Sequence, residues 1–183
     1  MAALWKGLLQ MIYYQYNEVT IRNMEDADAQ IICAAEIAQG DHVTVEKYHT
    51  RLRDQAEGRC AALVAQYRGD VAGYINVYYD STWGAFANCG LCEIVDFGVL
   101  EKFRRRGIGS TLMDAAEALA FAKADTVYLG VGLHAGYGSA QRMYVKRGYI
   151  PDGSGVWYGE TVCAPYSACM NDDDLVLYFS KSK

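Results

Sequence analysis

A short basic segment with two glycines combines residue types that suit the binding of a diphosphate group. This segment, called the phosphate loop below, consists of Arg104, Arg105, Arg106, Gly107, Ile108 and Gly109. A diphosphate requires several backbone N–H groups that point to one place, and the first turn of a helix supplies them. Glycine lets the backbone approach the phosphates closely, while arginine and the helix dipole add positive charge. Ser110 and Thr111 follow as further donors, so the segment predicts a diphosphate site; alone, it also fits a solvated basic loop.

Two common nucleotide-binding motifs do not fit this segment. No lysine follows the second glycine, as the P-loop of nucleoside triphosphatases requires. The dinucleotide-binding fingerprint has a third glycine and a βαβ context, and both are missing here. The predicted ligand is therefore a diphosphate of another kind.

The cysteines and histidines give weaker signals. Cys89 and Cys92 have a spacing known from zinc sites, but Cys163 and Cys169 are too far apart for the second tight pair of a zinc ribbon. A redox pair would precede a helix, whereas this pair precedes a predicted strand. We therefore expect free thiols and no metal. His134 directly follows a predicted strand, where it is either a functional-site residue or a packing residue; His42 and His49 are weaker candidates still.

Near the C-terminus, the predicted loop 153–174 carries both aromatic and acidic residues. The simplest interpretation of the acidic run Asp172, Asp173 and Asp174 is a solvated loop. If the loop folds over a pocket, these carboxylates would attract a cationic amine. Trp157, Tyr158 and Tyr166 are candidates for lining that pocket.

Composition restricts the classes of protein. The chain has 183 residues, of which 52% are hydrophobic and 21% charged, which favours a single domain over residues 1–183. Met11 is an alternative start that would make residues 1–10 an N-terminal extension. The net charge of −5 argues against nucleic acid as the main partner. No apolar run approaches the roughly 20 residues that span a bilayer, and no secretory signal is visible, so we expect a cytoplasmic protein.

Periodicity predicts an alternation of strands and helices that would position these residues. Predicted strands cover residues 13–21, 60–67, 71–79, 91–100, 126–133, 149 onward and 175–179, with a hairpin at residues 60–79. Predicted helices cover residues 27–40 and 46–57, a segment starting at 108, and residues 138–147. The fold class is α/β: a mixed sheet with helices on both faces.

Two ordered motifs resemble a known family. Residues 99–112, which include the phosphate loop, resemble the acyl-CoA-binding motif Arg/Gln-x-x-Gly-x-Gly/Ala of the GNAT superfamily of N-acetyltransferases. Residues 140–149 resemble that family's next block, Ala-x-x-x-Tyr-x-x-x-Gly-Phe/Tyr, and residues 21–28 resemble its usual opening. The order of elements matches from about residue 11 to residue 179. Tyr137 is a departure, since many members have an asparagine there that contacts the cofactor arm.

The resemblance implies a fold and a set of roles. The sheet would be mostly antiparallel, with its fourth and fifth strands splayed apart. Backbone groups of Phe97, Gly98 and Val99 would bind the pantetheine arm and the thioester carbonyl of acetyl-CoA. Tyr144 lies where the family often has its general acid, and a phenol with a pKa of about 10 can protonate a thiolate. The alternative for Tyr144 is simple packing on its helix.

Glu93 is the candidate general base. Strand periodicity places Glu93, Val95, Phe97 and Val99 on one face and Asp96 on the other, where Asp96 would need a partner. Some family members have a catalytic glutamate at the position of Glu93, and burial would raise its basicity. The alternatives are a charge at the rim, a substrate-binding acid, or a base that is reached through water.

The predicted function is transfer of an acetyl group from acetyl-CoA to a primary amine by direct attack in a ternary complex. The acceptor is either a small-molecule amine or an amine of a peptide or protein, and we expect no membrane or nucleic-acid partner. Members of this fold often form homodimers. The alternative function is a non-catalytic acyl-CoA-binding or sensing domain, which would keep the phosphate loop and lack the acid or base.

Overall fold

The strands form one twisted sheet in the computed structural model, which describes residues 10–183. Their order across the sheet is β1-β2-β3-β4-β5-β6-β9-β7-β8. The strand bounds are β1 Ile12–Tyr16, β2 Val19–Asn23, β3 Cys60–Tyr67, β4 Asp70–Tyr78, β5 Cys92–Val99, β6 Thr126–Gly132, β7 Ile150–Tyr158, β8 Thr161–Val162 and β9 Leu175–Ser182. Within residues 10–183, β5 and β6 are the only neighbours that pair in parallel; the others are antiparallel. The predicted mixed, mostly antiparallel sheet is confirmed, and the extension considered for residues 1–10 lies almost wholly outside the described residues.

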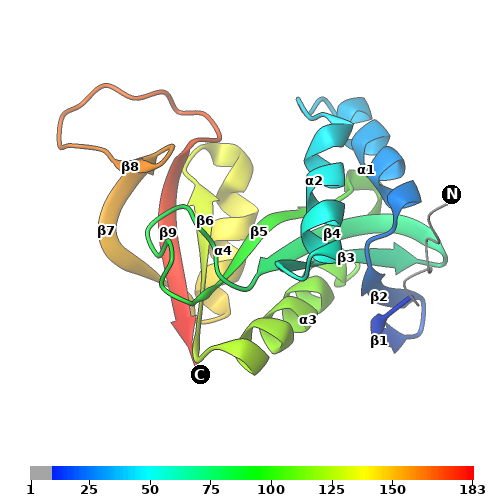
Figure 1. The fold of residues 1–183 in the computed structure, drawn as a ribbon. Helices are drawn as coiled ribbons and strands as arrows, with labels where there is room; N and C mark the ends of the chain where they lie inside the picture. Colours follow the sequence, from blue (N-terminus) through cyan, green and yellow to red (C-terminus); the bar gives the residue numbers. More distant parts are fainter. Residues whose placement is uncertain (1–9) are drawn as a thin grey trace, which may run out of the picture.

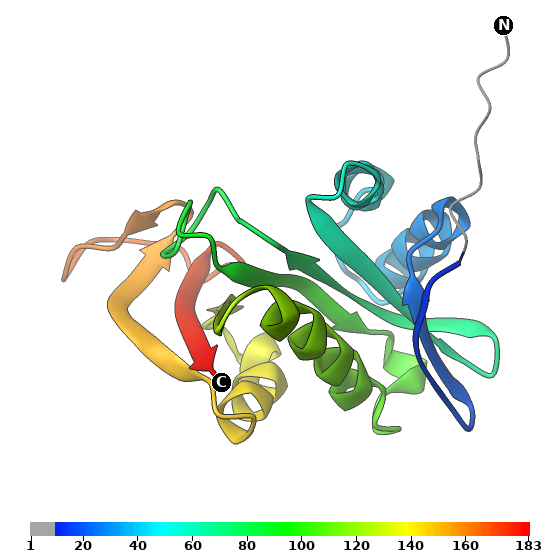
Figure 2. The ribbon, with the colours of Figure 1, turned by 60° about the horizontal axis from the view of Figure 1, so that its bottom comes forward.

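Helices cover both faces of this sheet, as predicted. Helices α1 (Asp26–Ala38) and α2 (Val45–Ala56) lie on one face, and α3 (Ile108–Lys123) crosses the other (Figure 1). Figure 2 brings α3 and α4 (Gly138–Lys146) forward together on the same side of the sheet. Short 3-10 helices span Glu101–Phe103 and Ala135–Tyr137. No helix within residues 10–183 is both long and apolar enough to cross a membrane.

The core has one cluster on each face. The larger cluster joins the sheet to α3 and α4, and includes Leu63, Ile75, Ile94, Leu112, Met113, Leu129 and Tyr144. The smaller cluster lies beneath α1 and α2, and includes Met24, Ile32, Tyr48, Val64 and Tyr74. The periodicity that predicted α3 is visible in its burial, because Ile108, Leu112 and Ala116 are at most 1% exposed. This packing fixes the start of α3 against the sheet, and therefore fixes the phosphate loop.

Residues 13–21 form a hairpin rather than the single predicted strand. β1 and β2 pair in antiparallel fashion, and the chain turns between Tyr16 and Val19. Asn17 has a φ of 50° in this turn. Asparagine tolerates the left-handed region better than most residues, because its short polar side chain bonds locally. The prediction was wrong because it read the turn as part of a loosely alternating strand.

The predicted loop 153–174 is also shorter than expected. β7 continues through Gly153 and Gly155 to Tyr158, and β8 adds a short pairing with it. Both glycines have positive φ angles, and the β7–β9 register shifts between Pro151 and Val156. Glycines within a strand often mark a bulge or another irregularity. The segment outside the sheet is reduced to residues 163–174.

A buried charge cluster ties the end of α4 to α3 and to β9. Glu117 of α3 is 7% exposed and accepts hydrogen bonds from Arg147 (2.8 Å) and Lys181 (2.8 Å). Arg147 also contacts Asp114 at 2.6 Å. Because α4 is short, these contacts supplement its limited apolar packing and hold its position relative to α3.

Candidate active site

The sheet opens between β5 and β6. The two strands pair only through Cys92↔Val127, Glu93↔Tyr128 and Ile94↔Leu129. Beyond these pairs, β5 continues to Val99 and β6 to Gly132, each still paired on its outer side. Residues 95–99 of β5 and 130–132 of β6 therefore do not pair with each other, and their backbone N–H and C=O groups on the facing edges lie outside the strand pairing. The fourth and fifth predicted strands correspond to β5 and β6, because the first predicted strand forms both β1 and β2. The predicted splay between them is therefore present, and it leaves backbone donors and acceptors of β5 available to an extended ligand.

A β-bulge lies in β5 at the start of this opening. The β4–β5 register shifts between Asn76↔Val95 and Tyr74↔Gly98, so that Asp96 and Phe97 face a single residue of β4. Asp96 has a φ of 50°, in the left-handed region. An extra residue in a strand interrupts the alternation of side chains and increases the local twist.

The bulge overturns the predicted arrangement of faces. Phe97 and Val99 pack toward Gly109 of α3, whereas Asp96 contacts α2 on the opposite side. Glu93 also points away from α3, because the neighbouring thiol of Cys92 contacts the Ala120 carbonyl of α3. Strict alternation had placed Glu93 with Phe97 and Val99, opposite Asp96. That prediction was wrong because the inserted residue reverses the alternation halfway along the strand.

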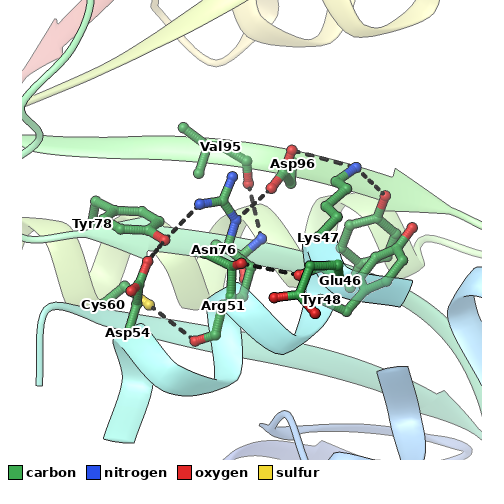
Figure 3. A network of polar contacts seen from close by, with 12 residues as sticks. Glu46, Lys47, Tyr48, Arg51, Asp54, Cys60, Asn76, Tyr78, Val95 and Asp96 are labelled. Atoms are coloured by element: carbon green, nitrogen blue, oxygen red, sulfur yellow. Dashed lines mark hydrogen bonds and ion pairs between the residues drawn. The ribbon is translucent and has the colours of Figure 1, made fainter. Parts of the chain in front are cut away.

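Two cations of α2 supply the partner that Asp96 needs. Arg51 Nε donates to Asp96 Oδ2 at 2.7 Å, and Lys47 Nζ lies 3.4 Å from Asp96 Oδ1 (Figure 3). Sequence reasoning missed both cations, which are separated by 45 and 49 positions from Asp96. The available signal was their i, i+4 spacing, which places them on one face of a predicted helix.

The phosphate loop connects β5 to α3. Gly107 precedes the first helical residue with a φ of 79°, and Arg105 also has a positive φ of 64°. The first helical hydrogen bond runs from the Thr111 amide to the Gly107 carbonyl, and no side chain of the described residues caps the helix. The amides of residues 108–110 therefore precede the helical hydrogen-bond ladder, as expected for an anion-binding turn.

The side chains of this segment have different surroundings. Arg104 donates to the Val99 carbonyl at 3.1 Å and contacts Glu101, which folds the loop back onto β5. Arg106 stacks 5.1 Å from the centre of the Tyr67 ring. Arg105 and Ser110 are exposed, Ile108 is buried, and the Thr111 hydroxyl donates to the Gly107 carbonyl at 3.3 Å. Only part of the predicted set is thus free to meet a ligand in this arrangement.

A groove of about 810 Å³ lies between the first turn of α3 and α4. Ser110 borders it on one side, and Ala135 and Gly138 border it near the end of β6. Arg142 and Lys146 add two cations from the same face of α4. Sequence reasoning did not select these two residues, although their i, i+4 spacing on a predicted helix was visible. The groove is basic at the place where the free amides of α3 begin.

Glu93 lies at the closed end of the opening between β5 and β6. It is 2% exposed, and the hydroxyl of Tyr128 lies 3.4 Å from its Oε2. Burial raises the pKa of Glu93 to about 7, although the Ser81 and Tyr128 hydroxyls and the charge of Arg51 partly oppose this shift. A carboxyl group with this pKa is half ionised near neutral pH, which suits a proton acceptor.

Tyr144 lies inside the core between α4 and the sheet. It is 6% exposed, and its ring packs edge-on against Tyr149 with 5.9 Å between ring centres. Desolvation raises the pKa of Tyr144 above its ordinary value. The phenol is therefore protonated at neutral pH.

Residues that follow β6 contact the loop before β9. Tyr137 donates to Asp173 Oδ1 at 2.8 Å, and His134 Nε2 lies 3.0 Å from the same oxygen. The other ring nitrogen of His134 accepts from the Gly136 amide at 3.1 Å, so both nitrogens are engaged. These hydrogen bonds lower the pKa of Asp173, and the more distant charge of Lys47 acts in the same direction. These contacts connect the segment 163–174 to the residues that follow β6, while the Asp173 side chain itself remains 80% exposed, as expected for a solvated acidic loop.

The remaining aromatic and thiol candidates are scattered. Tyr158 donates to Asp172 at 3.1 Å, Trp157 packs edge-on against Tyr178, and Tyr166 is fully exposed. Cys92 is buried in the core, whereas Cys89 is exposed, so the two do not present a common site. Among residues 10–183 there is no group of three or more histidine, cysteine or acidic residues placed to hold a metal ion.

Comparison with known proteins gives consistent matches. The model of the acetyltransferase (GNAT) family matches residues 24–149. An uncharacterized N-acetyltransferase of Chlorobaculum tepidum is 29% identical over 160 residues, covering 83% of this chain and 92% of that protein. Ard1 of Thermoplasma volcanium superposes with a TM-score of 0.65 at 24% identity, covering 91% of this chain and 98% of Ard1. Naa50 of Arabidopsis thaliana, in complex with the bisubstrate analogue CoA-Ac-MVNAL, superposes with a TM-score of 0.63 at 17% identity, covering 91% of this chain and all of Naa50.

Proposed function

Because the chain belongs to the acetyltransferase (GNAT) family, we propose that it transfers the acetyl group of acetyl-CoA directly to an amino group. One observation carries this proposal. The unpaired edge of β5 lies before the phosphate loop, and the free amides at the start of α3 lie at its end, near a basic groove. A ligand with a diphosphate at one end and an amide-containing arm at the other suits both features.

The donor would be held by three sets of groups. We propose that the amides of residues 108–110, with Arg105, bind the diphosphate, and that Arg142 and Lys146 add charge along the groove. The open edge of β5 at Phe97–Val99 would pair with the pantetheine arm and donate to the thioester oxygen. The CoA analogue present in the Naa50 structure supports a CoA donor for a chain of this fold.

Acetyl transfer forms a bond between the amine nitrogen and the acetyl carbon and breaks the bond between that carbon and sulfur. One proton leaves the amine, and the CoA thiolate gains one. We propose that Glu93 accepts the first proton through water, because its 2% exposure excludes direct contact with a bulky amine. Tyr144, whose raised pKa keeps it protonated, would donate the second. Backbone donors of the bulge would stabilise the oxyanion that develops between these steps.

The acceptor is an amine of a small molecule or of a peptide or protein. The Naa50 analogue joins CoA to a peptide sequence, which supports testing peptide N-termini first. On this chain, the acceptor would approach from the α2 side, where Asp173 is exposed and Glu93 is buried, whereas Asp96 is paired with Arg51 and Lys47. An exposed carboxylate such as that of Asp173 attracts a cationic amine.

The first test is thermal melting with acetyl-CoA, with CoA and with ATP as a control. A ligand at about 100 times its dissociation constant stabilises the folded state by about 2.7 kcal/mol. We expect both CoA species to raise the melting temperature, and Gly107→Glu to abolish the shift by placing a carboxylate at the phosphate loop. Gly58→Glu is the matched control, because Gly58 also has a positive φ with open space around its Cα but lies at the end of α2. If CoA stabilises neither the wild type nor Gly58→Glu, the proposed donor site is wrong.

A screen of peptides and small amines with acetyl-CoA then separates the enzyme from a non-catalytic binding domain. Release of the CoA thiol that depends on the amine, with an intersecting pattern of initial rates, supports direct transfer. A parallel pattern would indicate a covalent acetyl-enzyme instead. Binding of CoA without transfer to any amine would favour the sensing domain.

A further inference from the structure

The bulge in β5 is held in an unfavourable backbone conformation. Asp96 has a φ of 50°, in the left-handed region, which costs free energy for any residue other than glycine even though aspartate tolerates it better than most. Such a conformation persists only where surrounding contacts determine it, and it is often found at functional sites. The contacts around Asp96 therefore indicate what maintains the bulge.

Arg51 is the principal contact. Its Nε donates to Asp96 Oδ2 at 2.7 Å, and its Nη1 donates to the hydroxyl of Tyr78 at 2.6 Å (Figure 3). Tyr78 in turn donates to Asp54, one turn further along α2. The side chains of Arg51 and Asp96 are 16% and 20% exposed. The guanidinium group is thus fixed at both ends, and it joins α2 to the bulge in one geometry.

Asn76 holds the other side of the bulge. Its Nδ2 donates to the Val95 carbonyl at 3.4 Å, its side chain is completely buried, and its Oδ1 has no partner among the described residues. The carbonyl that precedes Asp96 is therefore turned toward β4. Asn76 thus bonds to the carbonyl that precedes Asp96, and Arg51 holds the Asp96 side chain.

We propose that Arg51 is a positioning residue for acetyl transfer: through Asp96 it sets the direction in which the backbone donors of residues 97–99 meet the thioester carbonyl. This inference rests on the proposed function. Helix α2 lies on the side from which the acceptor would approach, and through Arg51 it would also help to orient the donor. Lys47 lies beside the same carboxylate at 3.4 Å and makes a weaker, more exposed contact.

The test compares Arg51→Met with Arg53→Met. Arg53 lies two residues away on the same helix, and among the described residues its side chain donates to Glu46 and Thr50, both on α2, so it controls for loss of a cation from α2. Asp96→Gly is the second variant, because glycine accepts the positive φ without strain and removes the carboxylate. Asp96→Asn and Arg51→Lys replace either variant that fails to fold, as judged by melting.

The principal readout requires no acceptor. Acetyl-CoA labelled with carbon-13 at the carbonyl reports, by its NMR shift, how strongly the bound thioester oxygen is hydrogen-bonded. We expect Arg51→Met to move this resonance toward that of free acetyl-CoA, while the dissociation constant changes by less than about threefold because the diphosphate contacts remain. With any amine that the wild type accepts, kcat should fall by about 10- to 100-fold at a pH well above the pKa of Glu93.

A double-mutant comparison decides between positioning and a merely structural role. In the Asp96→Gly background, Arg51→Met should cause no further change in the carbonyl resonance, because its target is gone. An unchanged resonance in Arg51→Met, or an equal change in the Asp96→Gly background, would overturn the role of Arg51 while leaving the proposed function intact. Failure of the wild type to bind acetyl-CoA would overturn both.

Discussion

Replacing Glu93 with glutamine tests the acid–base chemistry and the burial of this side chain together. Burial raises the pKa of Glu93 from 4.5 to about 7 in the folded protein. A group whose pKa is higher in the folded than in the unfolded state contributes to the free energy of unfolding at low pH. For Glu93 this contribution is complete below the unfolded pKa of 4.5 and is lost as the pH rises through the folded pKa of about 7. The shift corresponds to roughly 3 kcal/mol of unfolding free energy above the folded pKa. Since Glu93 is 2% exposed, little of this is lost to solvent screening.

Glutamine has nearly the shape of protonated glutamate and cannot ionise. Glu93→Gln should therefore match the wild type at about pH 4 and exceed its unfolding free energy by roughly 3 kcal/mol at about pH 8. Urea unfolding at several pH values measures the difference. The same substitution should remove the acidic limb of the wild-type profile of kcat/KM near pH 7 and lower the plateau by about 100-fold or more.

Glu117→Gln provides a control of opposite sign. Although burial opposes the shift, hydrogen bonds from Arg147 and Lys181 lower the pKa of Glu117 below its ordinary value. Its contribution is present above the unfolded pKa and lost as the pH falls, so Glu117→Gln should be less stable than the wild type at neutral pH. If Glu93→Gln shows this second pattern, or a difference that does not vary with pH, the argument from burial is wrong. An acidic limb that survives in Glu93→Gln would show that another group accepts the proton.

Three further outcomes are expected. Tyr144→Phe should lower kcat by about 10- to 100-fold with little change in melting temperature, because its hydroxyl makes no hydrogen bond to another described residue. A donor whose thiol has a lower pKa needs less help from an acid, so recovery of the lost rate with such a CoA analogue would support the acid role, and no recovery would contradict it. Lys146→Ala should weaken CoA binding and reduce its dependence on salt, as measured by calorimetry at two ionic strengths; an unchanged salt dependence would exclude the groove along α4. Gly132→Ala should destabilise the protein by about 1 to 3 kcal/mol, because the new methyl group would overlap the ring of Tyr137, and adding Tyr137→Ala should recover part of that loss in urea unfolding.

Much of the scaffold could be predicted because its signals are local. The apolar spacing of Ile108, Leu112 and Ala116 predicted α3, and the turn at Gly69 predicted the β3–β4 hairpin. The phosphate loop was visible for the same reason, since its glycines and the helix that follows are adjacent in sequence. Each of these features depends on a few neighbouring residues.

The arrangement of the site was less predictable because it depends on contacts between distant segments. The insertion at Asp96 has no local signature in a strand-like segment, yet it places Glu93 and Phe97 on opposite faces of the sheet. The contact that maintains it comes from Arg51, on a helix 45 residues away. Asp173 was expected in a solvated loop, and its contacts with Tyr137 and His134 likewise require the fold to bring two segments together.

The short junction between β5 and β6 also has a consequence for the cooperativity of the sheet. Only three residue pairs join the two parts, one built from β1 to β5 and the other from β6 to β9. In the sequence, α3 lies between the two parts. The sheet is continuous at the three pairs and divided beyond them. A donor lying along β5 would supply hydrogen bonds where the strand ladder stops. Amide hydrogens of residues 95–99 that face β6 would then exchange with solvent rapidly in the free protein and slowly in the complex. The bound ligand would take the place of the missing strand pairing, so that the two parts of the sheet unfold as one unit.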